Sequence, residues 1–207
     1  GASCLEPDYA RCLVRLSPGG TDAQVVREFD LTTGRFVDDG FVLPEAKNDV
    51  DWVDRDTLLV TTDWGAGSLT TSGYPRIAQL WKRGTPLSAA VTVHESPVGA
   101  VQVSAASFVD ATRRWPMVSV GHTFFERELL VQAADGRFVP LGLPRGADVL
   151  DVIDGRAVAK LNEAADGFPA GALVAWSLPE IVAGRRPRGE LVLAPGDRQA
   201  IEEVAAR

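Results

Sequence analysis

The chain has 207 residues, enough for one domain with a substantial core, and its 45% hydrophobic and 24% charged residues are ordinary for a globular protein. Its formal net charge of −7 disfavours partners such as nucleic acid or an anionic membrane, because no basic stripe is present to release counterions. Its longest apolar stretches fall far short of the roughly 20 residues that span a bilayer. No N-terminal stretch has the order of a signal peptide, and a cytoplasmic location is favoured over a periplasmic one, although the sequence does not fix the compartment.

Short runs of β-branched and aliphatic residues dominate the chain and predict strands along its whole length. Turn-forming residues such as those at 17–22 separate them. Only 177–183 is expected to make a helical turn. The expected strands lie at 12–16, 24–29, 36–37, 57–62, 77–82, 90–94, 101–108, 117–122, 129–132, 149–153, 157–161, 172–176 and 190–193.

These strands follow a period. Gly34-Arg35-Phe36-Val37 recurs as Gly136-Arg137-Phe138-Val139, a displacement of 102 residues or twice 51, and the turn at 82–85 lies halfway between. The pattern predicts outer-rim hairpin turns at Thr33-Gly34, Arg83-Gly84 and Asp135-Gly136. Units of four strands and about 50 residues are typical of β-propeller blades. The sequence therefore predicts an all-β propeller fragment of about four blades of four-stranded antiparallel sheet.

The blades are expected at about 1–47, 48–97, 98–145 and 146–196, within one partial propeller domain over 1–207. The first unit offers only a fragment of its inner strand, around residues 2–5. For 197–207 the repeat predicts the start of a next inner strand, whereas local propensity favours a helix capped by Asp197. Both interpretations stay open. Unpaired backbone promotes association, so we expect the open blade edges to be paired. The C-terminal strand could close the arc in cis, or two chains could exchange it and form a dimer, and we favour this self-association.

The run from 11 to 87 resembles the propeller of bacterial prolyl oligopeptidase-family serine peptidases, and a looser likeness continues from Val91. The resemblance implies a parent in which a seven-bladed propeller caps an α/β-hydrolase domain with a Ser/Asp/His triad and admits only short peptides. The 207 residues offer about four blades and no hydrolase domain. The strings that carry the resemblance lie at 26–30, 40–47, 56–60, 67–76 and 83–87.

The implied function is that of a non-catalytic propeller segment, which gates the access of short peptides to the hydrolase domain of the parent, a serine-type oligopeptidase. The alternative is a stand-alone propeller module that binds a protein or a glycan, since propellers host many functions. No catalytic residue is expected in the chain itself. The Gly-x-Ser-x-Gly elbow is missing: Gly65-Ala66-Gly67-Ser68 lacks the closing glycine, and neither His94 nor His122 has a visible partner.

No cofactor or metal is expected either. Dinucleotide and Walker glycine loops do not occur. Strand alternation sends neighbouring carboxylates to opposite faces, so we interpret the acidic stretch as turn-formers and channel-lining charges, not as a calcium loop. Cys4 and Cys12 are interpreted as a pair of semi-buried thiols. The acidic stretch comprises Asp38, Asp39, Asp49, Asp51, Asp54 and Asp56.

A long loop rich in glycine and hydroxyl groups provides the candidate site. We expect it to meet the hydrolase domain or the substrate, the alternative being a merely flexible surface loop. Among the tryptophans, Trp64 and Trp115 lie at loop edges and are the candidates for external contact, while Trp52, Trp81 and Trp176 are expected in the core between blades. The candidate residues of the loop are Asp63, Trp64, Ser68, Thr70, Thr71, Ser72 and Tyr74.

Overall fold

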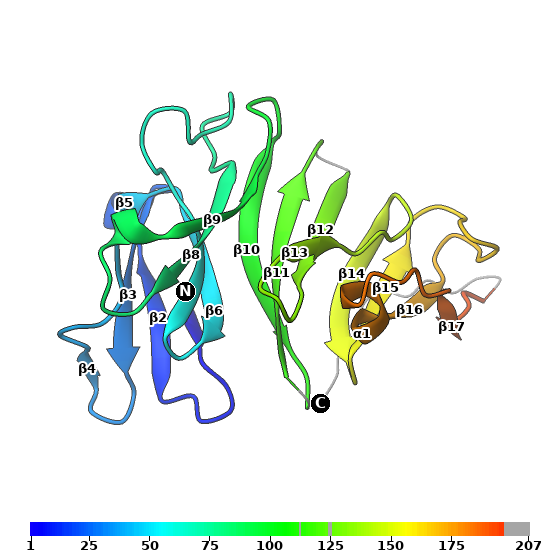
Figure 1. The fold of residues 1–207 in the computed structure, drawn as a ribbon, viewed down its shortest axis with the longest axis horizontal. Helices are drawn as coiled ribbons and strands as arrows, with labels where there is room; N and C mark the ends of the chain where they lie inside the picture. Colours follow the sequence, from blue (N-terminus) through cyan, green and yellow to red (C-terminus); the bar gives the residue numbers. More distant parts are fainter. Residues whose placement is uncertain (112, 124–125, 197–207) are drawn as a thin grey trace.

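The computed structural model of the chain describes residues 1–111, 113–123 and 126–196. Four antiparallel sheets follow one another along the sequence and stand side by side as an arc (Figure 1). The predicted all-β fold of four blades is therefore confirmed. The strand or helix expected at 197–207 lies outside the described residues and stays a prediction.

Each sheet is a meander in which successive strands pair with one another. The outer strand of the first blade is split into two pieces, β4 and β5, which both pair with β3. The first blade contains β1 (Ala2–Cys4), β2 (Arg11–Leu16), β3 (Gln24–Asp30), β4 (Arg35–Phe36) and β5 (Val42–Ala46); the second contains β6 (Asp49–Asp54), β7 (Thr57–Thr61), β8 (Ile77–Lys82) and β9 (Val91–Glu95); the third contains β10 (Gln102–Val109), β11 (Arg114–Gly121), β12 (Arg127–Gln132) and β13 (Phe138–Pro140); the fourth contains β14 (Ala147–Ile153), β15 (Arg156–Leu161), β16 (Leu173–Ser177) and β17 (Glu190–Leu193).

The predicted outer turns lie between the third and outer strands of their blades. Gly34, Gly84 and Gly136 adopt φ values of 66°, 73° and 85°, a region in which glycine has no steric penalty. The expected helical turn is α1 (Leu178–Val182), whose N-cap Ser177 accepts a hydrogen bond from the Glu180 N–H. Two short 3₁₀ turns, η1 (Pro18–Gly20) and η2 (Leu87–Ala89), complete the described helices, and none of these is long and apolar enough to cross a membrane.

The connections divide the arc into two faces (Figure 1). The loops between second and third strands, and those that lead from one blade to the next, gather at the top of the view; we call this the loop face. The tight connections from inner to second strand, such as 154–155, lie at the bottom; we call this the hairpin face. The inner strands β1, β6, β10 and β14 line the inside of the arc, which we call the central channel.

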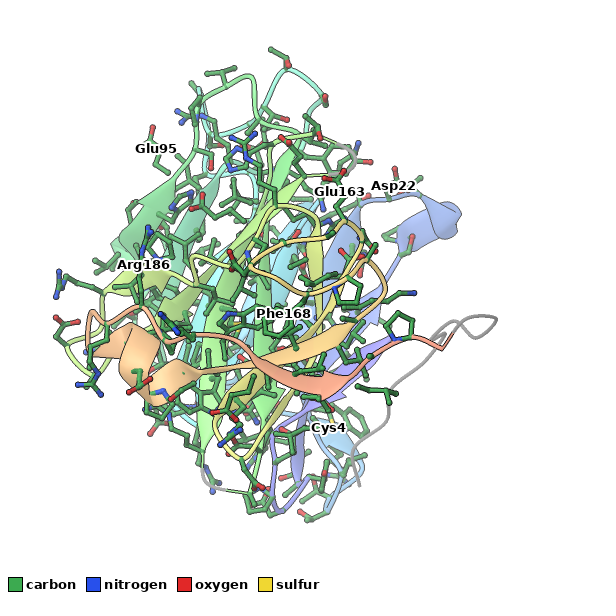
Figure 2. All side chains as sticks on the ribbon, turned by 90° about the vertical axis from the view of Figure 1, so that its right-hand side faces the viewer. Cys4, Asp22, Glu95, Glu163, Phe168 and Arg186 are labelled. Atoms are coloured by element: carbon green, nitrogen blue, oxygen red, sulfur yellow. A yellow bond between two sulfur atoms is a disulfide. The ribbon has the colours of Figure 1, made fainter. Side chains whose placement is uncertain are left out.

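The core lies between the blades. Phe41, Trp52 and Trp81 pack between the first and second blades, with edge-to-face ring contacts from Phe41 to both tryptophans. A larger cluster joins the third and fourth blades, and Phe168 covers its edge from the long loop after β15 (Figure 2). Trp176 lies in this cluster, as predicted, but so does Trp115 at 2% exposure. The expected outward role of Trp115 is wrong, because it is the second residue of β11 and points into the neighbouring blade.

The two cysteines form a disulfide, so the expectation of two free thiols is wrong. The inner-strand fragment expected around residues 2–5 is β1, but so short a strand does not fix its register with β2 from sequence. Once β1 pairs with β2, Cys4 lies directly opposite Cys12 in the ladder, and the two sulfur atoms meet.

A buried ion pair clamps the first blade to the second. The Glu28 carboxylate, on β3 and 1% exposed, accepts hydrogen bonds from Arg83 Nη1 at 2.7 Å and Nη2 at 3.1 Å. It also accepts the Phe41 N–H at 3.0 Å, while Arg83 Nε donates to Asp56 at 2.9 Å. Each charge is thus fixed by further hydrogen bonds, which is what a desolvated ion pair requires.

Breaking this pair should be costly. Arg83→Met leaves the Glu28 carboxylate buried without its cation, and we expect the free energy of unfolding to fall by about 3 kcal/mol. The double variant Glu28→Leu with Arg83→Met should recover part of the loss, because no charge is then buried. Urea titration measures both. Arg137→Met, which breaks the exposed pair with Asp135, is the control and should change stability little; an Arg83→Met effect no larger than this control would contradict the clamp.

Candidate functional site

The loop singled out by the sequence, between β7 and β8, lies on the loop face (Figure 1). Its first half is closed by its own side chains. Asp63 Oδ1 accepts from the Gly65 N–H at 2.8 Å and from Ser68 Oγ at 2.9 Å, and Ser68 Oγ accepts from the Trp64 N–H at 2.9 Å. Ser68 is 3% exposed, so its hydroxyl group stabilises a turn and is not presented to solvent.

The second half of the loop joins the second blade to the third. The Thr71 N–H donates to the Val98 carbonyl at 3.0 Å, and buried Thr70 donates through Oγ1 to the Val101 carbonyl at 3.2 Å. Half-buried Trp64 directs its indole N–H to the Ile77 carbonyl at 3.1 Å. Asp63, Thr71 and Ser72 are exposed.

Tyr74 is the candidate that borders a cavity. Its ring lies beneath Lys47 Nζ at 4.1 Å, a cation–π contact, and the pair forms part of the wall of a cavity of about 450 Å³ that is lined by the first three blades. Arg15, Asp49 and Gln102 line the same cavity.

A second cavity, of about 1060 Å³, separates the third and fourth blades on the loop face. Its origin is the size of the side chains that face the fourth blade. In the hairpin-face half of β11, Trp115 and Met117 fill the space between blades, whereas Ser119 follows towards the loop face. β10 likewise contributes Ser104 and Ala106. Small side chains there cannot reach the neighbouring blade, so the interblade core stops and a cleft remains.

The cleft has polar groups at its mouth and apolar groups deeper in. Arg127 has no ion pair among the described residues, and His122 Nε2 lies 3.3 Å from Glu128 Oε2. None of these residues is among the site residues predicted from the sequence. The period-two alternation of the inner strands, repeated blade by blade, is the signal that could have found the wall of the cleft. Its polar lining includes Gln102, Ser104, Ser119, His122, Glu126, Arg127, Glu128 and Arg145, and its apolar lining includes Phe108, Leu129, Leu141, Leu143 and Val149.

Asp49 belongs to both cavities and so marks where they meet. It opens β6, its carboxylate lies 3.9 Å from Arg15 Nη2, and its side chain is 41% exposed. Burial raises the pKa of Asp49 to about 6, although Arg15 and the Val50 N–H both lower it. Burial also raises the pKa of Asp51, whose carboxylate accepts the N–H groups of Trp52 and Ser107. Both carboxylates lie on the inner strand β6, and their channel-lining role stays a prediction.

No Ser/His/Asp triad is formed by the residues in 1–111, 113–123 and 126–196. The one serine bonded to a histidine there is Ser96, whose Oγ lies 2.8 Å from His94 Nε2. Ser96 is 3% exposed, and burial lowers the pKa of His94. The same described residues hold no group of histidine, cysteine and acidic side chains arranged to bind a metal ion.

Comparison with known families shows which family has this architecture. Residues 2–159 match the family "prolyl oligopeptidase, N-terminal beta-propeller domain". The match covers well over half of the chain, and the fold has the antiparallel blades that such a domain requires. The chain therefore belongs to this family.

Two curated relatives agree with the assignment. An uncharacterized peptidase of Sinorhizobium fredii is 37% identical over 212 residues, which cover 97% of this chain and 29% of that protein. An uncharacterized peptidase of Rickettsia prowazekii is 34% identical over 113 residues, covering 51% of this chain and 16% of that protein. The chain thus spans less than a third of the length of these relatives.

Solved structures show the same fold. A post-proline cleaving enzyme from Rickettsia typhi superposes with a TM-score of 0.86 at 21% identity, covering 99% of this chain and 32% of that one. A chain from a structural study of two prolyl endopeptidases superposes with a TM-score of 0.69 at 19% identity, covering 93% of this chain and 27% of that one. Oligopeptidase B from Leishmania major superposes with a TM-score of 0.60 at 13% identity, covering 86% of this chain and 24% of that one.

The charge of Asp49 should make stability depend on pH in a definite direction. Because its folded-state pKa lies above the ordinary value, the folded protein binds the proton more tightly than the unfolded chain. The free energy of unfolding of the unmodified chain, relative to that of Asp49→Asn, should therefore fall as the pH rises from about 4 to about 6. Above about pH 6 it should stay at this lower value. Since the side chain is 41% exposed, we expect a difference of about 1 kcal/mol at most.

The direct measurement is a carboxyl ¹³C titration by NMR, with a midpoint near 6 expected for Asp49. Arg15→Met should move this midpoint upwards, because the guanidinium favours the ionised form. A midpoint near 4 in the folded protein would contradict the burial of this carboxyl group.

Proposed function

We propose that this propeller segment gates the access of short peptides to the hydrolase domain of a prolyl oligopeptidase-type serine peptidase. The observation that carries the proposal is the pair of cavities that open on one face of the arc and meet at Asp49 beside the inner strands. Membership of the N-terminal propeller family supports a hydrolase domain as partner. An extended peptide can be accommodated between blades or along the inner strands, whereas a folded protein is too wide for either.

The loop face is the side that we propose to meet the hydrolase domain. The loop between β7 and β8 offers it the exposed Thr71 and Ser72, and the interblade cleft offers Arg127 and the His122–Glu128 pair at its mouth. The internal hydrogen bonds of the loop would keep it in one conformation on contact, which lowers the entropy cost of docking.

No specific observation favours the alternative of a stand-alone module for glycans. Such a site presents aromatic faces to the sugar, but Trp52, Trp81, Trp115 and Trp176 are buried. Trp64 is half-buried and already donates its indole N–H within the chain.

The coding sequence tests the proposed partner. The proposal requires a reading frame that also encodes an α/β-hydrolase domain with a Gly-x-Ser-x-Gly elbow. A natural stop after Arg207, with no such domain in the same protein, would contradict it.

Kinetics of the full-length peptidase test the gate. We expect kcat/KM for a proline-containing fluorogenic peptide of about eight residues to exceed strongly that for the same sequence within a folded domain. Replacing Trp64 and Tyr74 by alanine should change peptide turnover several-fold, equivalent to about 1 kcal/mol in the barrier.

Phe36→Ala is the matched control, because it removes an aromatic ring from the outer rim, away from both cavities described above. Unfolding curves of all variants separate a kinetic effect from lost stability. Equal turnover of the short and the embedded substrate, or unchanged kinetics in the loop variant, would contradict the proposed roles of the gate and of the loop respectively.

A further inference from the structure

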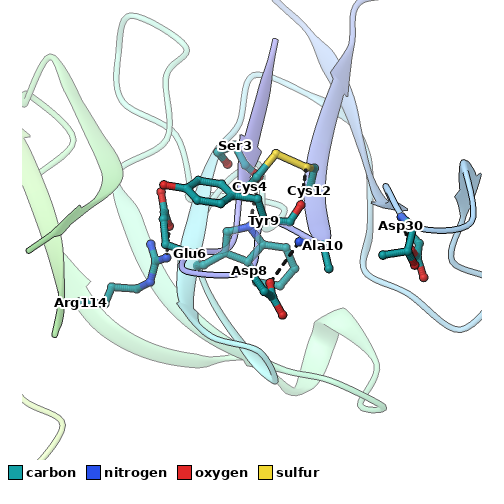
Figure 3. Close-up of a disulfide and its surroundings, with 11 residues drawn as sticks. Ser3, Cys4, Glu6, Asp8, Tyr9, Ala10, Cys12, Asp30 and Arg114 are labelled. Atoms are coloured by element: carbon teal, nitrogen blue, oxygen red, sulfur yellow. Dashed lines mark hydrogen bonds and ion pairs between the residues drawn. A yellow bond between two sulfur atoms is a disulfide. The ribbon is translucent and has the colours of Figure 1, made fainter. Parts of the chain in front are cut away.

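The first hairpin of the chain is held by very little backbone pairing. β1 has three residues and pairs with β2 alone, through Ala2–Val14, Ser3–Leu13 and Cys4–Cys12. So short a ladder is marginal on its own. The Cys4–Cys12 disulfide closes it at the end next to the connecting loop 5–10, which we call the strap (Figure 3).

Both β1 and the strap make polar contacts with neighbouring blades. The Ser3 carbonyl accepts the indole N–H of fully buried Trp52, from the inner strand of the second blade, at 3.1 Å. On the strap, the Glu6 carboxylate pairs with Arg114 of the third blade (Figure 3). This ion pair joins the first blade to the third past the inner strand of the second, at the hairpin-face end of the central channel.

The two cysteines differ in burial. Cys12 is 2% exposed, whereas Cys4 is half-buried, so the Cys4 side is the more open one for an incoming thiolate. Attack there forms a mixed disulfide on Cys4 and expels the Cys12 thiolate, which takes up a proton. The second thiol of a dithiol reductant then displaces Cys4, so that the protein gains two thiols and the reductant becomes a cyclic disulfide.

We propose that Cys4–Cys12 is a thiol-responsive clasp, whose reduction by a dithiol releases β1 and the strap and thereby loosens the Glu6–Arg114 bridge across the channel end. The release is local, because the remaining strands of the first blade stay joined to the second through the Glu28–Arg83 clamp. Only the consequence for peptide access rests on the proposed function.

Hydrogen exchange of the whole chain, with and without dithiothreitol, tests the clasp. The Leu5 and Arg15 amides, which donate to the Arg11 and Gly1 carbonyls, should exchange at least about tenfold faster after reduction. Amides of β7 should not change. Unchanged protection at Leu5 and Arg15, or loss of protection throughout the chain, would overturn a local clasp.

Two variants separate the covalent bond from the ion pair. In the double variant Cys4→Ser with Cys12→Ser, the Leu5 amide should exchange fast from the outset, and dithiothreitol should not change its rate. If this variant fails to fold, the claim of a local effect is overturned. Glu6→Gln keeps the disulfide and should leave Leu5 protected until reductant is added. Fast exchange at Leu5 in oxidised Glu6→Gln would show that the ion pair, not the disulfide, holds β1.

Turnover by the full-length peptidase tests the proposed consequence of reduction for peptide access. Reduction and Glu6→Gln should each raise kcat/KM for a peptide of about 30 residues several-fold relative to a tetrapeptide, and the serine double variant should show no further response to reductant. If the enzyme still selects peptides by size but neither treatment alters this selection, the proposed role of the strap at the channel is overturned. The proposed function as a gate is then retained. If the oxidised enzyme shows no size selection at all, the proposed function fails, and the exchange result still decides the clasp.

Discussion

A four-stranded, twisted sheet cannot cover its own two faces, and every other feature of this chain follows from how the blades cover one another. Apolar side chains supply most of the contact, as Phe41, Trp52 and Trp81 do between the first two blades. Polar groups fix the register at few points. Glu28 and Arg83 clamp the first blade to the second, and the Asp110 carboxylate binds both the Trp115 indole N–H at 3.0 Å and the Gly155 N–H at 2.7 Å, joining the third blade to the fourth.

The same constraint explains where the cavities lie. Where large side chains face each other, as at Trp115 and Met117, the blades close; where Ser104 and Ser119 face the neighbour, they stay apart. The two cavities described above therefore lie on the loop face, while the hairpin face is tied by Asp110 and by the Glu6–Arg114 bridge. The position of the two cavities supports the proposed gate on the loop face.

Much of this architecture could be predicted from local patterns. The recurrence of Gly34-Arg35 as Gly136-Arg137 marks equivalent turns, because a left-handed residue is needed at the same point of each outer hairpin. The buried positions of Trp52, Trp81 and Trp176 follow from their places within strands. The disulfide could not be predicted, because the short inner-strand fragment expected around residues 2–5 does not fix a register with β2, and only that register brings Cys4 opposite Cys12.

Other errors have the same origin in distant contacts. Trp115 lies near a turn in sequence, but its environment is set by the fourth blade. The glycines and hydroxyl groups of the loop between β7 and β8 are typical of a flexible loop, yet Thr70 and Thr71 donate to Val101 and Val98 in the connection that leads to the third blade. The interblade cleft is invisible to local analysis, because it arises from the size of side chains on two strands that meet only in the fold. Pairing of strands was local and predictable, whereas packing of blades was not.

We propose that the loop face of this propeller meets the hydrolase domain of a full-length peptidase. A photo-reactive amino acid in place of Lys47, on the loop face, or of Lys82, at the hairpin-face end of β8, tests it in the full-length peptidase. We expect an intramolecular cross-link to the hydrolase domain from position 47 and none from position 82. A cross-link from position 82 without one from position 47 would contradict it.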